Sequence, residues 1–150
     1  MRARTASAVT LGLALSCAGC RSFDASRRTT RVETPSVRTT AGVMYEELMR
    51  GQGPCAETGD EVLLDYVVSL ENGTRVDSTL DRGVPVPVRI GEAFVRGLDD
   101  GLAGICAEGR RRITVPPELA YGAEGVPGLV PPNATLVFEV HAVEVRPGKR

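Results

Sequence analysis

Apolar and polar residues alternate along several stretches of this 150-residue chain. Between Glu61 and Leu70 every second residue is apolar, namely Val62, Leu64, Tyr66, Val68 and Leu70. The same alternation runs from Ala134 to Val145, at Leu136, Phe138, Val140 and Ala142. A period of two is typical of a strand with one buried face. The pattern therefore predicts two long strands that share one core.

Four shorter segments also have the character of strands. They are Val43 to Met49, Thr74 to Ser78, Val84 to Ile90 and Gly109 to Val115. Asn72-Gly73 is a strong hairpin signal, so the segment from residue 74 to 78 should return beside the strand over residues 61–70. Prolines interrupt the segment from residue 84 to 90, which is therefore predicted to lie at a sheet edge or a bulge.

The period changes to a helical one between residues 94 and 105, where the apolar residues are Phe94, Leu98, Leu102 and Ile105. Three glycines in the same segment weaken this helix, so it should persist only by packing against the sheet. The chain is therefore predicted to form an α+β domain, with an antiparallel sheet of about five strands wrapped on one short helix.

The first twenty residues have the plan of a secretory signal peptide. Arg2 and Arg4 precede an apolar stretch, residues 8–15, that is too short to span a bilayer. The segment ends in Cys17-Ala18-Gly19-Cys20, which resembles a bacterial lipobox and implies that the mature protein begins at a lipidated Cys20. Cleavage by an ordinary signal peptidase and lipidation at Cys17 are the alternatives. A redox C-x-x-C pair is disfavoured because these cysteines end an export segment.

Charge divides the chain into two parts. Residues 1–41 hold seven Arg and two acidic residues, whereas residues 42–150 hold eleven Lys or Arg and seventeen acidic residues. Residues 21–41 are rich in Arg, Ser and Thr and are predicted to be a disordered tether, which a folded domain follows over residues 42–150. An acidic domain with few aromatic residues is a poor binder of nucleic acid, because phosphate contacts need clustered cations.

The usual catalytic groups are missing from the folded part. The single histidine, His141, is out of phase with the apolar face of its strand and is predicted to be exposed. Without a second histidine, a histidine-based metal site has no support. No glycine-rich phosphate loop follows a strand, and serine-nucleophile signatures are absent. We therefore expect a function that uses no metal and no cofactor.

A loop rich in proline and glycine leads from Tyr121 into the last strand and ends at Phe138. A loop of this length inside a small domain usually serves a function. The motifs around it are Leu63-Leu64-Asp65-Tyr66, Glu71-Asn72-Gly73-Thr74-Arg75-Val76-Asp77-Ser78, Val95-Arg96-Gly97-Leu98 and Ile113-Thr114-Val115-Pro116-Pro117-Glu118-Leu119-Ala120-Tyr121-Gly122. Together they resemble the FKBP-type peptidyl-prolyl isomerases, the macrolide-binding immunophilins, over roughly residues 57–145.

The resemblance implies prolyl isomerisation, which fits the missing catalytic groups because the reaction breaks no bond. It twists an X–Pro amide over a barrier of about 18–20 kcal/mol. An apolar pocket disfavours the polar planar amide relative to the twisted one. By position, the pocket tyrosine, aspartate, hydroxyl donor and floor would be Tyr66, Asp77, Tyr121 and Phe138. Taken without the family, Asp77 would be a surface turn residue, and the two tyrosines would be core residues.

The other substrate-binding positions that the resemblance implies are Val76, Val86, Phe94, Val95 through its backbone N–H, Leu98, Leu129 and Val130. Val76 and Val86 stand where the family usually has Phe, and Leu98 stands where it usually has the floor Trp. These exchanges remove buried aromatic surface, so we expect modest isomerase activity and weak macrolide binding. The alternatives are a catalytically weak chaperone module that binds proline-containing or apolar segments, and a structural lipoprotein.

Cys55 and Cys106 are the cysteines that remain after export. Their surroundings resemble secretory members of the family in which a disulfide joins these two places, and two buried free thiols are the alternative. The sequence thus predicts an isomerase that acts on proline-containing clients outside a bacterial cytoplasm. Its location would be the membrane, through the lipid anchor, or the periplasm.

Overall fold

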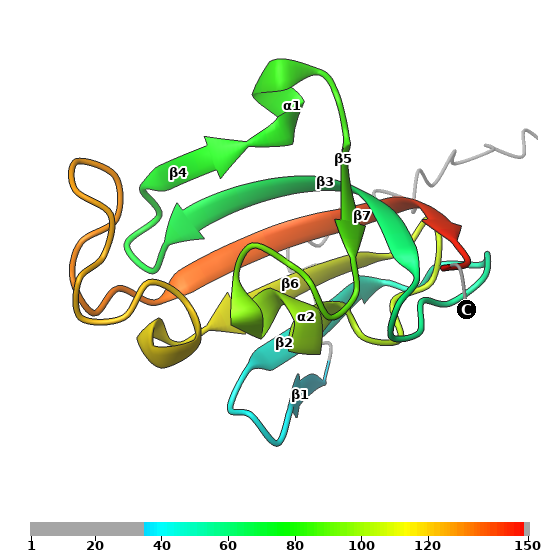
Figure 1. The fold of residues 1–150 in the computed structure, drawn as a ribbon, viewed down its shortest axis with the longest axis horizontal. Helices are drawn as coiled ribbons and strands as arrows, with labels where there is room; N and C mark the ends of the chain where they lie inside the picture. The colour runs from blue at the N-terminus through cyan, green and yellow to red at the C-terminus, as the bar shows by residue number, and fades with distance from the viewer. Residues whose placement is uncertain (1–34, 149–150) are drawn as a thin grey trace, which may run out of the picture. The chain divides into compact units, whose positions relative to one another are not determined.

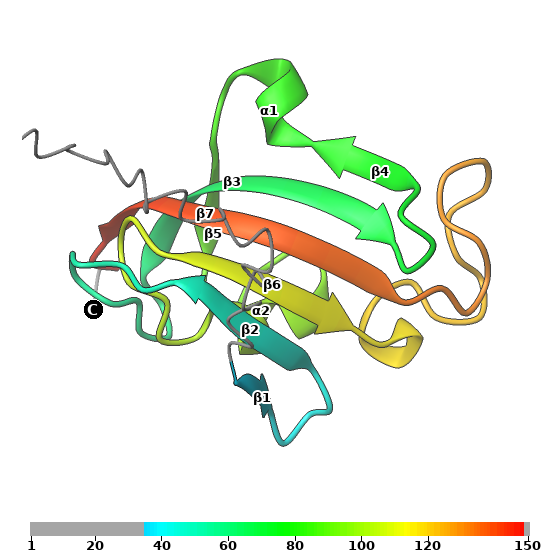
Figure 2. The ribbon, with the colours of Figure 1, turned by 180° about the vertical axis from the view of Figure 1, so that it is seen from behind.

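The protein is described by a computed structural model over residues 35–148, shown from two opposite sides in Figures 1 and 2. One antiparallel sheet contains seven strands. They are β1 (Ser36–Arg38), β2 (Met44–Met49), β3 (Glu61–Leu70), β4 (Arg75–Ser78), β5 (Val86–Arg89), β6 (Arg110–Val115) and β7 (Leu136–Arg146). The connections include the helices α1 (Thr79–Arg82) and α2 (Arg96–Leu102) and the 3-10 turn η1 (Pro117–Leu119). The predicted fold class is confirmed, with seven strands instead of about five.

The two longest strands, β3 and β7, pair along their whole lengths, from Glu61 opposite Arg146 to Leu70 opposite Leu136. The strand order is β1-β2-β6-β7-β3-β4, and β5 also pairs with β3. Residues 61–64 of β3 pair with β5, and residues 67–69 pair with β4. The proline-interrupted segment therefore lies at an edge of the sheet, as predicted, with Pro87 opposite Leu63.

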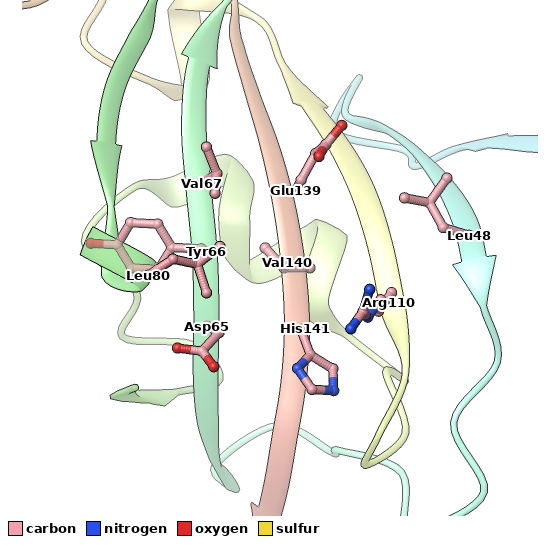
Figure 3. A pocket seen from close by; sticks show the side chains of 9 residues that line it. All are labelled: Leu48, Asp65, Tyr66, Val67, Leu80, Arg110, Glu139, Val140 and His141. Carbon is pink, nitrogen blue, oxygen red and sulfur yellow. The ribbon is translucent and has the colours of Figure 1, made fainter. Parts of the chain in front are cut away.

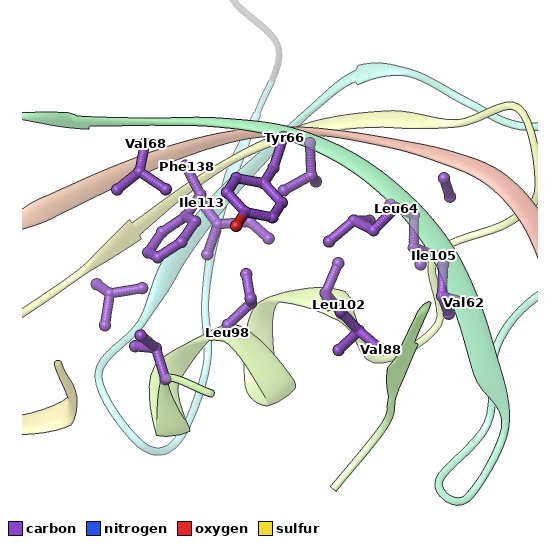
Figure 4. Packing of buried hydrophobic residues seen from close by; sticks show 14 of the residues in the cluster. Val62, Leu64, Tyr66, Val68, Val88, Leu98, Leu102, Ile105, Ile113 and Phe138 are labelled. Carbon is purple, nitrogen blue, oxygen red and sulfur yellow. The ribbon is translucent and has the colours of Figure 1, made fainter. Parts of the chain in front are cut away.

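The core lies between the sheet and α2, which covers one side of the sheet only (Figures 1 and 2). Every alternate residue predicted to be apolar and inward in β3 and β7 is buried. Figure 4 shows Leu98 and Leu102 of α2 pointing toward Tyr66, Ile113 and Phe138 of the sheet. The hydrophobic period of the sequence thus identified the face of each long strand that builds the core.

The glycines of α2 let the helix approach the sheet closely. A Cβ atom built on Gly97 would collide with the side chain of Val115, and one built on Gly101 would collide with Ile113. The same residues that lower the helix propensity therefore permit the packing that stabilises the helix. The helix is shorter than the predicted 94–105, because Phe94 lies before its N-cap Val95.

Three short elements, β1, α1 and η1, were not predicted. Strand β1 lies inside the segment that we expected to be a disordered tether, and it pairs Ser36 with Glu46 and Arg38 with Met44. Its three residues are all exposed, so no burial pattern marks it in the sequence. Residues 1–34, with the predicted signal peptide and Cys20, lie outside the described residues. Within residues 35–148, no helix is long and apolar enough to cross a membrane.

A disulfide joins Cys55 to Cys106, 51 residues further along the chain. Cys106 follows α2, and Cys55 lies in the connection from β2 to β3. The backbone supports this link, because Ala56 N–H donates to the carbonyl of Ile105 at 2.7 Å. The pairing that the family resemblance implied is confirmed, and it ties the end of α2 to the start of the longest strand pair.

Candidate active site

A tyrosine, an aspartate and an arginine from three consecutive elements meet beside the middle of β3. The hydroxyl of Tyr66 in β3 donates to Asp77 Oδ2 in β4 at 2.9 Å. Arg82, at the end of α1, donates to the Tyr66 hydroxyl at 3.0 Å and to the same carboxylate oxygen at 3.3 Å. The ring of Tyr66 belongs to the core, whereas Asp77 and Arg82 are partly exposed. This network places a fixed polar group at the edge of an apolar surface.

Local sequence explains why Arg82 arrives there. Ser78 caps α1 by accepting from Leu80 N–H, and Gly83 ends the helix in the left-handed conformation at φ 68°. Thr79 is fully buried, and its hydroxyl accepts from Tyr66 N–H at 2.9 Å. Sequence analysis missed both α1 and Arg82. A serine cap, an acidic first turn and a glycine after the last turn, over residues 78–83, were the available signal.

The network changes the protonation of its members. Burial raises the pKa of Tyr66, and the hydrogen bond to Asp77 adds to that increase. Burial opposes ionisation of Asp77, but the bonds from Tyr66 and Ser78 N–H and the charge of Arg82 outweigh it, so the pKa of Asp77 is lowered. The hydrogen bond to Tyr66 raises the pKa of Arg82. At neutral pH the site therefore holds a protonated phenol between a carboxylate and a guanidinium.

Three aromatic rings lie in a row beside this network. The ring centroids of Tyr66 and Phe94 are 5.6 Å apart, and those of Phe94 and Phe138 are 6.3 Å apart. Phe138 is fully buried, as a floor residue should be, and Phe94 is 50% exposed. Leu98, which is also fully buried, points from α2 toward the rings of Tyr66 and Phe138 (Figure 4). The exposed ring of Phe94 thus lies between two buried rings, those of Tyr66 and Phe138.

The remaining predicted site residues fall into two groups. Four of them belong to or pack against the same hydrophobic cluster as Tyr66 and Phe138, namely the buried Val95 and Val130 and the partly buried Val76 and Val86. Tyr121 and Leu129 lie on the loop between η1 and β7 and are 39% and 51% exposed. The structure therefore brings most of the predicted site together and leaves these two on the adjoining loop.

A groove lies on the outer side of Phe94. It has a volume of about 470 Å³ and runs between β5 and the turn before α2, with Val86, Pro87, Arg89, Glu92, Ala93 and Phe94 among its lining residues. Phe94 therefore contributes one face to the aromatic row and another to this groove. Among the described residues, no cluster of three or more His, Cys, Asp or Glu could hold a metal ion.

A second hollow, of about 200 Å³, lies on the side of the sheet that α2 does not cover (Figure 3). It is lined by Asp65, Arg110, Glu139 and His141 together with Leu48 and Leu80. His141 is half-buried and pairs across the sheet with Asp65 and Arg110. The side chain of His141 therefore points away from the core, as predicted, but it is only partly exposed to solvent.

The sheet, the single packed helix and the tyrosine–aspartate pair beside a buried phenylalanine define an immunophilin-type prolyl isomerase domain. The family model described as FKBP-type peptidyl-prolyl cis-trans isomerase matches residues 53–143. A relative named FK506-binding protein, from Neisseria meningitidis serogroup B, is 42% identical over 105 residues, which are 69% of this chain and 96% of that protein. The chain therefore belongs to the FKBP family, and it is a peptidyl-prolyl cis-trans isomerase, as the sequence predicted.

Solved structures agree with this assignment. FkpA from Escherichia coli matches with a TM-score of 0.69 and 35% identity, over 76% of this chain and 53% of that longer chain. AtFKBP13 matches with a TM-score of 0.67 and 31% identity, over 73% of this chain and 98% of that one. The match to the first covers about half of that protein's length.

Proposed function

We propose that this isomerase assists the folding of exported proteins by isomerising X–Pro bonds at the aromatic row of Tyr66, Phe94 and Phe138. The observation that carries the proposal is the Tyr66–Asp77–Arg82 network, which fixes a polar group at the edge of this apolar surface. The proline ring would lie against Phe138 and Leu98, with Tyr66 as one wall. Asp77 would supply a negative charge at the solvent-exposed edge of this apolar surface.

The chemistry follows from the polarity of these groups. A planar X–Pro amide is polar through resonance and loses solvation beside an apolar surface, whereas the twisted amide is less polar and loses less. The N–H of Val95 and the hydroxyl of Tyr121 would hold the peptide by hydrogen bonds, each of which contributes about 0.5–1.5 kcal/mol. The exposure of Tyr121 leaves its hydroxyl accessible to a bound chain.

Weak macrolide binding is part of the proposal. Val76, Val86 and Leu98 offer aliphatic side chains where aromatic ones are usual in the family, and each loss of apolar contact lowers the affinity for a large ligand. Relatives of this chain carry the name FK506-binding protein. We therefore expect FK506 to bind this chain more weakly than an immunophilin with an aromatic pocket.

Action outside the cytoplasm is supported by the Cys55–Cys106 disulfide, because structural disulfides persist in oxidising compartments. The basic, apolar and small-residue order that ends at Cys20 supports export and a lipid anchor. Mass spectrometry of the membrane fraction of expressing bacteria should identify an acylated peptide that begins at Cys20. A Cys20→Ser variant should lose the acyl group and keep isomerase activity. A mature wild-type protein that is soluble and begins at another residue would refute the anchor.

The client function has its own test. Refolding of a reduced, proline-containing periplasmic protein, limited by X–Pro isomerisation, should accelerate when the purified protein is added. Asp77→Ala should reduce this acceleration, and Arg75→Ala, an exposed change in the same strand, should not. Suppression of aggregation without acceleration by the wild type would support the chaperone alternative and contradict the proposed role.

A further inference from the structure

Phe94 packs against core rings and is also half exposed. Its ring packs near Tyr66 and Phe138 at centroid distances of 5.6 and 6.3 Å, both within the range of favourable aromatic pairs. Half of its surface nevertheless remains exposed. Its exposed half therefore lies beside two rings that belong to the buried core. The ring therefore lies at the mouth of the proposed pocket.

The position of this ring compensates for an aliphatic floor. Leu98 points from α2 toward Tyr66 and Phe138 (Figure 4), and Phe94 approaches the same two rings from the turn before the helix. The chain thus supplies the aromatic surface of Phe94 at the mouth of the pocket, and Phe138 together with the aliphatic Leu98 at its base. A bulky residue at position 98 and a phenylalanine at position 94 would compete for the space beside the same rings.

The backbone before Phe94 is held in place. The carboxylate of Asp99, in the first turn of α2, accepts from Gly91 N–H at 2.8 Å and from Ala93 N–H at 3.2 Å. Bonds to an ionised acceptor are stronger than neutral ones. The turn that carries Phe94 is therefore tied to the helix that carries Leu98, and the ring keeps its distance from the pocket base.

Phe94 also lies between the other two rings and the groove along β5, since it packs near Tyr66 and Phe138 and lines the groove as well. A ligand that extends from the pocket toward this edge must pass the ring. An extended polypeptide is narrow, whereas a macrolide is a large ring.

From these contacts we infer that Phe94 is the residue that determines ligand size at this site. Its ring narrows the mouth, so the pocket admits a proline on an extended chain and disfavours a macrolide. This inference rests on the proposed location of the prolyl pocket and deepens it. Phe94 acts here as a selectivity residue. Replacing it should change the affinity for a macrolide more than it changes the rate of isomerisation.

The test is a cycle of four proteins: the wild type, Phe94→Val, Leu98→Trp and the double variant. FK506 affinity is measured by calorimetry, and kcat/KM is measured on a short proline-containing peptide without a coupled protease. Phe94→Val should bind FK506 about tenfold more tightly than the wild type, the scale on which an apolar pocket discriminates ligands by size. Its kcat/KM should fall by only about twofold to threefold, because Tyr66 and Phe138 remain.

Leu98→Trp alone should not improve FK506 binding, because Phe94 still occupies the space that the indole needs. The double variant should bind FK506 more tightly than either single variant. Leu48→Ala, at an exposed site on the other side of the sheet, is the control and should change neither quantity. Circular dichroism establishes that each variant is folded.

The outcomes separate this inference from the proposed function. If the wild type isomerises the peptide and folded Phe94→Val binds FK506 no more tightly, Phe94 does not set ligand size and the pocket location stands. The same conclusion follows if Leu98→Trp alone equals the double variant. If all three variants keep wild-type kcat/KM and wild-type FK506 affinity, the pocket itself has been placed wrongly, and both ideas fail.

Discussion

The hydroxyl of Tyr66 donates to the carboxylate of Asp77 at 2.9 Å, although the two residues lie eleven positions apart on different strands. Strand β4 returns antiparallel to β3 and pairs Asp77 with Val68, which brings the carboxylate to the end of the tyrosine ring. Arg82 then binds both groups. The pair is therefore fixed by the sheet on one side and by α1 on the other.

Removal of the carboxylate should slow catalysis. We expect Asp77→Ala to lower kcat/KM by about tenfold, because hydrogen bonds to charged groups contribute about 1.5–3 kcal/mol and one factor of ten corresponds to about 1.4 kcal/mol. Tyr121→Phe should have an equal or smaller effect. Both effects are measured in a protease-free isomerisation assay, with a series of peptides that differ in the residue before proline. Asp81→Ala, at an exposed ion pair with Arg75, is the matched control. Wild-type rates in both site variants would show that the residues are wrongly assigned.

The stability that Asp77 contributes should decrease as the pH is lowered into the acidic range. Its pKa is lowered in the folded state, so the contribution is present above the ordinary carboxyl pKa and is lost as the pH falls through the lowered folded value. The difference in unfolding free energy between the wild type and Asp77→Asn should therefore be constant from about pH 5 to 8 and shrink below about pH 4. Urea unfolding at a series of pH values measures it. A difference that changes between pH 6 and 8 would assign the effect to another group.

The long strands could be predicted because burial on one face leaves a period of two in the sequence. Residues 61–70 show that period throughout, and residues 136–142 show it up to the register shift after Ala142, beyond which the next buried residue is Val145. Strand β1 could not be found in this way, since all three of its residues are exposed and only backbone pairing with β2 holds them. The helix was found from its apolar spacing, but its ends were not, because Phe94 belongs to the turn before the helix.

Among the site residues, too, periodicity reveals those on the buried faces of strands and misses the others. Tyr66 and Phe138 are readable as inward residues of strands, and their joint role came from the family resemblance. Arg82 lies on a four-residue helix with no apolar period, so only its caps could have indicated it. The contact of Phe94 with two rings depends on how Asp99 folds the preceding turn. Periodicity carries no information about such a contact.

The close packing of α2 predicts an unusual response to alanine. Alanine normally favours a helix over glycine by about 1 kcal/mol. At Gly101, however, the added Cβ would collide with Ile113 of β6, and overpacking a core typically costs about 1–3 kcal/mol. We therefore expect Gly101→Ala to destabilise the domain in urea unfolding. Asp100→Ala, at the exposed neighbouring position, should change the unfolding free energy by about 0.5 kcal/mol or less. A stabilised Gly101→Ala variant would show that the helix is free to shift.

Two adjacent arginines in β6 should differ sharply in their effect on stability. Arg111 is buried and donates to the carbonyls of Gly101, Ala103 and Gly104, at 2.9, 2.9 and 3.1 Å, at the end of α2. Its guanidinium also lies 4.6 Å from the ring centroid of Tyr45. Helix ends leave carbonyls that need partners, so Arg111→Ala would leave buried acceptors unpaired.

We therefore expect Arg111→Ala to lower the unfolding free energy by about 1–3 kcal/mol, because it removes hydrogen bonds from a charged donor and leaves buried carbonyls unsatisfied. Arg112 faces the other side of the sheet, where it pairs with Glu46 and Glu139 while 41% exposed, and exposed pairs contribute about 0–1 kcal/mol. Arg112→Ala is thus the matched control. Urea unfolding followed by far-ultraviolet circular dichroism compares the two. Equal losses would mean that Arg111 does not support the end of α2, and that the helix carrying Leu98 is held by its apolar face alone.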